Sequence, residues 1–166
     1  TLIDAARIEQ LQAQDLRDLV RLEPGISVRG DAARFGDESI TIRGIGGNRV
    51  RIETDGVPRP SAFAIGSFAN AGRSLADLDF VGKIEILKGP APATYGSAAI
   101  GGIVSVVTLN PIDLLEDERR FAARSRWRYS SDDHGGQGSA LVAGRVAGIE
   151  WLSGFLHRDA QELQNN

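Results

Sequence analysis

Residues 83–108 read KIEILKGPAPATYGSAAIGGIVSVVT, and this stretch decides the fold. Residues 83–88 alternate between charged and apolar side chains, which predicts a strand with one buried face. Gly89–Pro90 ends that strand, because proline has no backbone N–H to donate to a sheet. Residues 103–108 form a continuous β-branched run, as expected for a strand buried on both faces. The stretch therefore predicts two strands joined by a glycine-rich connection.

Two short helices are predicted near the start of the chain. Asp4 can cap a helix that carries Ile8 and Leu11 on one face. Asp15 can cap a second helix over residues 16–22, which Pro24–Gly25 ends.

The apolar period then changes from helical to alternating. Residues 39–43 and 49–54 read as strands, and Asp55–Gly56 is a turn signal. The longest irregular segment, residues 58–73, is expected to be functional or mobile. The helices and strands together predict a compact α+β unit, with a small mixed sheet and two short helices.

The character of the sequence changes after Asn110–Pro111. Residues 120–129 place aromatic side chains on one face and arginines on the other. Residues 139–146 and 149–157 are further strand candidates, joined at Ala147–Gly148. Strands of about ten residues with one apolar side are typical of transmembrane β-barrels.

A soluble antiparallel sheet gives the same pattern, so both alternatives stay open at this point. The barrel hypothesis predicts that Trp127, Trp151 and Phe155 face lipid. The soluble alternative needs these side chains inside a protein core.

Composition excludes several classes of protein. The formal net charge of -3 argues against a nucleic-acid binder, and the absence of cysteine excludes disulfides and thiolate metal sites. No apolar run approaches the roughly 20 residues of a membrane helix. The chain has no methionine and no signal peptide, so we expect it to begin after processing or within a longer product.

The sequence also lacks complete signatures of the enzyme sites that its glycine-rich and acidic segments suggest. Residues 43–47 lack the helix that a dinucleotide loop needs, and residues 89–97 lack the lysine of a P-loop. Asp132–Asp133–His134 has no ligand spacing suited to a metal. We expect a protein that is not an enzyme.

A series of motifs resembles the plug domain of TonB-dependent outer-membrane receptors. In chain order these are LRDL with PGI (16–19 and 24–26), IRG (42–44), TDGVP (54–58), KIEILKGP (83–90) and YGSAAIGGIV (95–104). Residues 45–50, 68–79, 110–115 and 157–165 most resemble the heme and hemoglobin receptor branch. The resemblance implies a plug over residues 1–111, then a linker and the first strands of an incomplete barrel over residues 112–166.

The resemblance further implies a transport receptor in the outer membrane of a Gram-negative bacterium. Its plug would gate the uptake of heme, from free heme or hemoglobin, as cargo rather than as a permanent cofactor. TonB would act on a segment before Thr1, and outer-membrane lipid would surround the barrel. Receptors for ferric siderophores or vitamin B12 share this fold, and a soluble plug-like binding or signalling module is the alternative of another class.

Three charged residues are candidates for contacts between the plug and the barrel wall. In the family, the positions of Arg43, Glu85 and Lys88 belong to a charge cluster that faces glutamates of the barrel. Lys88 departs from the pattern, because arginine is usual there. The alternative is that all three are solvated charges at strand edges.

The segment 58–73 is the candidate ligand-facing loop. The resemblance implies that Arg59 and Arg73 meet propionates, while Phe63 and Phe68 contact a flat apolar ring. The alternative is a mobile connection with incidental aromatics.

Iron ligands are scarce in this sequence. Residues 1–110 hold no histidine, and their only tyrosine, Tyr95, lies in a turn motif. We expect no metal site in the plug, and His134 stays a candidate for a heme iron ligand.

Overall fold

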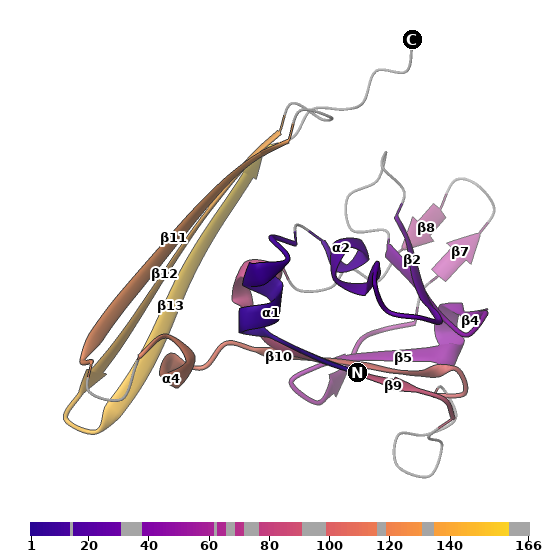
Figure 1. Cartoon of the computed structure of the whole chain (residues 1–166), viewed down its shortest axis with the longest axis horizontal. Coiled ribbons are helices and arrows are strands. Elements are labelled where there is room, and N and C mark those ends of the chain that lie inside the picture. The colour runs from indigo at the N-terminus through magenta and orange to yellow at the C-terminus, as the bar shows by residue number, and fades with distance from the viewer. Residues whose placement is uncertain are drawn as a thin grey trace. The chain divides into compact units, whose positions relative to one another are not determined.

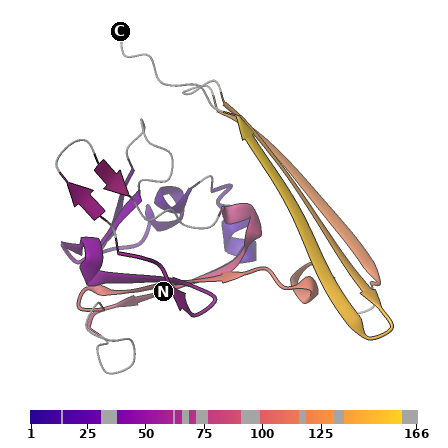
Figure 2. The same cartoon turned by 180° about the vertical axis from the view of Figure 1, so that it is seen from behind.

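The computed structural model describes residues 1–13, 15–30, 38–61, 63–65, 69–71, 77–90, 99–115, 119–130 and 135–159. The chain forms two compact units, Thr1–Thr108 and Leu109–Asn166 (Figures 1 and 2). The division follows Thr108, whereas the sequence motifs predicted it after residue 111.

A five-stranded mixed sheet organises the first unit. Across the sheet the strands are β1 (Leu2–Asp4), β9 (Val81–Lys88), β10 (Gly102–Thr108), β5 (Val50–Thr54) and β6 (Val57–Pro58). The central strand β10 is antiparallel to β9 and parallel to β5, so the mixed sheet predicted from the sequence is confirmed.

Two short helices cover one face of this sheet (Figure 1). They are α1 (Ala5–Gln10) and α2 (Leu16–Val20). Each has the expected aspartate cap: the Arg7 N–H donates to the Asp4 carboxylate at 2.8 Å, and the Asp18 N–H donates to Asp15 at 2.9 Å. The helix predicted to reach residue 22 ends at Val20, because its apolar face ends there and Leu22 is 69% exposed.

The core lies between the sheet and the helices. It holds, among others, Ile8, Leu16, Leu19, Val50, Ile52, Ile84, Ile86, Val104 and Val106. The prediction that β10 is buried on both faces is only partly right. Ile103 on the far face is buried, but Ser105 and Val107 are half-buried, because that face carries the charged side chains of β9 and β5.

Two smaller sheets complete the first unit. Strands β2 (Ile26–Gly30), β3 (Glu38–Ile42) and β4 (Ile45–Gly46) form one, and β7 (Phe63–Ile65) and β8 (Ala69–Ala71) form the other. Two 3-10 turns, Gly47–Arg49 and Leu78–Phe80, precede β5 and β9. The segment 58–73, expected to be irregular, thus contains a short antiparallel strand pair.

The second unit is a three-stranded antiparallel sheet with one short helix. Its elements are α4 (Pro111–Leu114), β11 (Phe121–Ser130), β12 (Gly135–Val146) and β13 (Ile149–Asp159). Asp113 accepts a hydrogen bond from the Asn110 N–H at 2.7 Å and so caps α4. Among the described residues, no helix has the length and apolar character needed to cross a membrane.

Three hairpins use a residue–glycine pair as their turn: Arg43–Gly44, Asp55–Gly56 and Ala147–Gly148. In each pair both residues have positive φ, as a type I′ turn requires. The turns expected at residues 55–56 and 147–148 are therefore confirmed.

Candidate functional site

Arg43 occupies the first position of the turn between β3 and β4. Its φ of 49° is a left-handed conformation, which costs a non-glycine residue roughly 1–2 kcal/mol. Its backbone N–H donates to the carbonyl oxygen of Gly25 at 2.7 Å, which ties this turn to the start of β2. The side chain is exposed, so a fixed turn presents the guanidinium to solvent.

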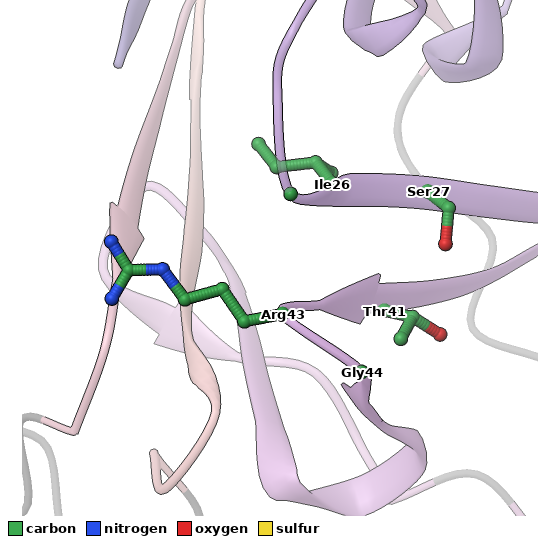
Figure 3. A pocket seen from close by; sticks show the side chains of 6 residues that line it. Ile26, Ser27, Thr41, Arg43 and Gly44 are labelled. Atoms are coloured by element: carbon green, nitrogen blue, oxygen red, sulfur yellow. The ribbon is translucent and has the colours of Figure 1, made fainter.

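A cavity of about 520 Å³ opens beside this turn. Ser27 and Thr41 face each other across the β2–β3 pair and line the cavity with hydroxyl groups. Figure 3 shows the Arg43 side chain extending away from these two hydroxyls. The cavity therefore offers neutral polar groups and does not enclose the arginine charge.

Lys88 lies at the end of β9 and binds the turn that follows α2. Its Nζ donates to Glu23 Oε2 at 3.3 Å and to the Pro24 carbonyl oxygen at 3.0 Å. Arg43 contacts the next carbonyl of the same turn, that of Gly25. The structure therefore brings two of the three predicted residues to the turn at residues 23–25, Lys88 through its ammonium group and Arg43 through its backbone N–H.

Glu23 is the acidic partner that the sequence analysis missed. Its carboxylate accepts a hydrogen bond from the Thr1 hydroxyl at 2.8 Å and pairs with Lys88. These two hydrogen bonds, with the Thr1 bond the larger cause, hold the pKa of Glu23 below its ordinary value. Because Glu23 and Lys88 are 65 residues apart, no local pattern could have revealed the pair.

Glu85, the third predicted charge, lies apart from the other two. On β9, Glu85 points to the same side as Lys83. Lys88 points to the other side, together with the buried Ile84 and Ile86. Glu85 pairs with Lys83 at 2.8 Å, and about half of each side chain is exposed. The three residues do not form one cluster: Glu85 is on the outer face of the sheet, and Lys88 is on the helix-covered face.

The outer face of the sheet holds a second ion pair. Arg51 Nε lies 3.0 Å from Glu53 Oε2, and the Glu53 side chain is only 7% exposed. Glu53 and Glu85 flank Ser105 in the same row of the sheet. Charged residues at every second position of residues 49–54 indicate such a charged face on the strand.

The candidate ligand loop is described only in part. Arg59 is tied to its own hairpin: its N–H donates to the Ile52 carbonyl oxygen at 2.8 Å, and its Nε donates to the Thr54 hydroxyl at 3.3 Å. The backbone of Phe63 belongs to β7. Phe68 and Arg73 lie outside the described residues, so the structure leaves the ligand-facing role of this loop as a prediction.

No group of three or more potential metal ligands occurs in the described ranges. His157 is exposed on β13, and His134 falls outside those ranges. The iron-ligand role considered for His134 therefore stays a prediction.

Large apolar side chains project into solvent from one face of the three-stranded sheet. This aromatic face carries Phe121, Trp127, Tyr129, Ile149, Trp151 and Phe155, and their exposed fractions run from 41% to 83%. Its aromatic residues come from the outer strands β11 and β13, whereas the central strand β12 contributes mainly small residues. The alternation predicted from the sequence is confirmed along β11.

Two tryptophans lie directly on glycines of β12. A Cβ atom at Gly138 would lie 2.8 Å from the Trp127 ring, and one at Gly144 would lie 2.5 Å from the Trp151 ring. Both contacts are closer than a side chain tolerates, so the indoles pack flat against the backbone of β12. The aromatic face is thus an ordered surface rather than a set of loose side chains.

The opposite face of this sheet is basic. It carries Arg124, Arg126 and Arg128 on β11, Arg145 on β12 and Arg158 on β13. Glu150 is the one acidic residue on this side among the described strand residues, and it binds Arg145 Nε at 2.8 Å. We call this surface the basic face.

Comparison with known proteins identifies a family for most of the first unit. Residues 1–103 match the family described as TonB-dependent Receptor Plug Domain. This range ends just inside β10 and covers the Lys88–Glu23 pair, both helices and the candidate loop.

Curated relatives extend the similarity over both units. The chain is 31% identical to a hemoglobin and hemoglobin-haptoglobin-binding protein A of Haemophilus influenzae, across 99% of the chain and 16% of that protein. It is 32% identical to a transferrin-binding protein A of the same species, across 95% of the chain and 18% of the relative. The chain therefore spans about a sixth of the length of these relatives.

Solved structures show the same fold. The FrpB iron transporter from Neisseria meningitidis superposes with a TM-score of 0.81 at 25% identity, over 97% of this chain and 24% of that one. The siderophore receptor PirA from Pseudomonas aeruginosa superposes with a TM-score of 0.64 at 24% identity, over 98% of this chain and 29% of that one.

Proposed function

Because this chain belongs to the TonB-dependent receptor plug family, we propose that it is the plug and first wall strands of an outer-membrane importer of an iron-bearing ligand. The family is one of receptors rather than enzymes, which agrees with the non-enzymatic function expected from the sequence. The observation that carries the proposal is the combination, in one chain, of a plug match and an exposed aromatic face on the strands that follow.

The aromatic face has the dimensions of a lipid-facing barrel wall. Phe121 and Trp151 mark one end of it, and Trp127 and Tyr129 mark the other. Phe121 and Tyr129 are separated by about 26 Å along β11, at ~3.3 Å per residue. A strand tilt of about 35–45° reduces this to roughly 20 Å, near the ~25 Å apolar band that aromatic girdles flank in outer-membrane barrels.

The two ends of the face then correspond to the two membrane interfaces, where tryptophan and tyrosine gather. Alanine, valine and serine lie between them on the same face, at Ala123, Val142 and Ser153. In this arrangement the basic face looks toward the lumen of the barrel. Water and protein, rather than lipid, then surround the arginine side chains.

The plug has a short edge strand at its start. β1 pairs with β9 over only three residues, and the Ile86 N–H donates a hydrogen bond of 2.8 Å to the Thr1 carbonyl oxygen. We infer that TonB pulls on a segment before Thr1, so that β1 is the first strand to separate from the sheet. Few ladder bonds must then break before the rest of the sheet bears the load.

We propose that the charged residues contact the barrel wall, as the resemblance suggests, but in two places rather than one. Arg43 and Lys88 lie by the turn at residues 23–25, and Glu85 lies on the outer face of the sheet. Charges that are partly exposed can meet opposite charges of a barrel wall without forming a dry, permanent interface. We propose two separate polar contacts with the wall.

Heme, taken from free heme or hemoglobin, is the ligand we propose. The similarity to hemoglobin-binding proteins over 99% of the chain supports it. The 32% identity to transferrin-binding proteins favours a second candidate, iron taken from a protein carrier. In both cases the ligand is cargo, and no cofactor stays bound.

A heme titration separates these candidates. We expect the intact receptor to give a sharp Soret shift at a defined stoichiometry, and residues 1–111 alone to give none, because they contain no histidine. Phe63→Ala and Phe68→Ala in the intact receptor should weaken heme binding without abolishing the shift. A stoichiometric shift with residues 1–111 would place the iron ligands in the plug. An intact receptor that ignores heme but binds transferrin or a ferric siderophore would overturn the heme assignment alone.

A further inference from the structure

The carboxylate of Glu23 joins three parts of the first unit at one oxygen atom. Its Oε2 accepts a hydrogen bond from the Thr1 hydroxyl at 2.8 Å and another from Lys88 Nζ at 3.3 Å. Thr1 precedes β1, Glu23 lies in the turn after α2, and Lys88 is the last residue of β9. We call these three residues the clasp. Neither the plug match nor the wall contacts proposed above assign a role to the bond between Thr1 and Glu23.

The backbone of the turn fixes the acidic residue of the clasp. The Glu23 N–H donates to the Val20 carbonyl oxygen at 2.9 Å, and the Glu23 carbonyl oxygen accepts from the Ile26 N–H at 3.3 Å. Lys88 Nζ also donates to the Pro24 carbonyl oxygen at 3.0 Å, which ties the turn to the end of β9. The carboxylate therefore stays with the turn if the edge strand moves.

The edge strand β1 has few other attachments. Of its three paired residues only Ile3 is buried, and Leu2 is 63% exposed. The Thr1 carbonyl oxygen accepts a hydrogen bond from the Ile86 N–H at 2.8 Å. The pKa of Glu23 is lowered, first by the Thr1 hydroxyl, so the hydroxyl donates to an ionised carboxylate. Such a bond is stronger than one between neutral groups, so it contributes much of what holds this end of β1.

From these contacts we propose that the clasp keeps β1 on the sheet in the resting receptor and opens when TonB pulls. The inference rests on the proposed function, which supplies the pull. At rest the turn holds the Thr1 hydroxyl while β9 holds the Thr1 backbone, so β1 separates only when both contacts break. Lys88 still binds Glu23 and the Pro24 carbonyl after that separation. The turn thus keeps its structure and can bind Thr1 again when the pull ends.

Hydrogen exchange in the intact receptor, measured without TonB, tests the clasp. The reporter is the Ile86 N–H, which exchanges when local opening separates it from the Thr1 carbonyl oxygen. Thr1→Val keeps the branched shape of the side chain and removes the hydroxyl. We expect the Ile86 N–H to exchange about three- to tenfold faster in this variant. Glu23→Ala, which removes the acceptor, should accelerate exchange to the same degree.

The double variant shows whether the two side chains act through one bond. Thr1→Val combined with Glu23→Ala should exchange no faster at Ile86 than either single variant, because a single interaction is lost. Effects that multiply, or an unchanged rate in Thr1→Val, would overturn the clasp.

Lys83→Met is the matched control on the same strand. It breaks the 2.8 Å ion pair between Lys83 and Glu85, and Lys83 is directly opposite Asp4 of β1, but the clasp stays intact. The Ile86 N–H should then exchange at the rate of the unmodified receptor. Acceleration equal to that of Thr1→Val would show that any loss of charge from β9 loosens β1, which contradicts the inference.

Two further measurements complete the test. Exchange of the β5 amides, residues 50–54, should be the same in Thr1→Val as in the unmodified receptor, and faster exchange there would mean that the whole sheet is loosened rather than β1 alone. Iron uptake by Thr1→Val should reach half its maximum at a lower cellular level of TonB, and an unchanged requirement would contradict the opening of the clasp by TonB.

The proposed function and the clasp fail in different ways. Absence of TonB-dependent iron uptake by the unmodified receptor contradicts the proposed function, whereas the exchange measurement needs no TonB. A receptor with normal uptake, in which the exchange of the Ile86 N–H is unaffected by Thr1→Val, contradicts only the clasp.

Discussion

The two units use the same strand alternation in opposite ways. In the first unit, the apolar side of β9 carries Ile84 and Ile86, which are almost fully buried. In the second unit, the apolar side of β11 carries Trp127, which is 83% exposed. Alternation reveals that a strand has two faces, but it does not reveal what covers the apolar one.

The difference lies in what the chain supplies to cover each sheet. Residues Ile8, Leu16 and Leu19 of the two helices pack onto the first sheet and complete its core. The second sheet has only the four-residue helix α4 beside it, and its aromatic face remains uncovered among the described residues. We infer that the first unit provides its own apolar environment, whereas the second requires lipid.

The largest expected effect follows directly from this comparison. Residues 1–111, expressed alone, should be monomeric in buffer and should unfold in one cooperative transition, since they contain a complete core. The 166-residue chain should associate unless detergent is present, because it adds open strand edges and a large exposed apolar surface. Size-exclusion chromatography with light scattering checks both, and a monomeric 166-residue chain without detergent would break the comparison.

Within the first unit, the cost of truncating a side chain should depend on which face it occupies. Ile52→Ala should lower the free energy of unfolding of residues 1–111 by about 2–5 kcal/mol, since it opens a cavity in a dense core. Leu87→Ala removes a similar side chain from the exposed outer face and should cost less than about 1 kcal/mol. Urea titrations give both values, and equal losses would show that the core is misassigned.

A smaller effect is expected where the first unit ends. Asp55 accepts hydrogen bonds from the Thr108 N–H at 2.9 Å and from its hydroxyl at 2.8 Å. Asp55→Asn keeps the positive φ favourable but weakens both bonds, and we expect a loss of about 1–2 kcal/mol. A double-mutant cycle with Thr108→Val should give a coupling smaller than that loss, because valine removes the hydroxyl bond and keeps the backbone N–H bond. Additive effects would mean that the two side chains act independently.

The smallest effect concerns pH. The pKa of Glu23 is lowered in the folded state, first by the Thr1 hydroxyl and then by Lys88. Its contribution to stability is therefore complete above the unfolded pKa of about 4.3 and is lost as pH falls through the lower folded value. Because the Glu23 side chain is partly exposed, we expect its contribution to the free energy of unfolding to be less than about 1 kcal/mol. With Glu23→Gln or Lys88→Met, the free energy of unfolding of residues 1–111 should fall less between about pH 5 and 3 than it does in the unmodified protein. If both variants lost as much stability as the unmodified protein over this range, Glu23 would not contribute to the pH dependence.

Local chemistry made much of the fold predictable from the sequence. Asp4 and Asp15 correctly predicted where the two helices start. The residue–glycine pairs at 55–56 and 147–148 correctly predicted two hairpin turns. Each of these signals acts over a few residues. The three-residue strand β1 was missed, because it exists only through pairing with β9 some 80 positions later.

The candidate charges show which part of their arrangement can be predicted from the sequence. Glu85 and Lys88 are three residues apart on one strand, so they must face opposite sides. That parity was visible in the sequence, and it separates them in the structure. The Lys88–Glu23 pair was not visible, since it depends on how α2 packs against the end of β9.

The central claim is that the aromatic face of the second unit meets lipid and the basic face does not. This chain has no cysteine, so single cysteines placed in turn at positions 122–127 of β11 can each carry a spin label in the membrane-embedded receptor once any cysteine elsewhere in the receptor is replaced. Power saturation then compares collisions with oxygen, which concentrates in lipid, and with a water-soluble nickel chelate. We predict a period of two, with oxygen favoured at positions 123, 125 and 127 and disfavoured at 122, 124 and 126. Equal accessibility along the strand, or the reverse period, would contradict the account.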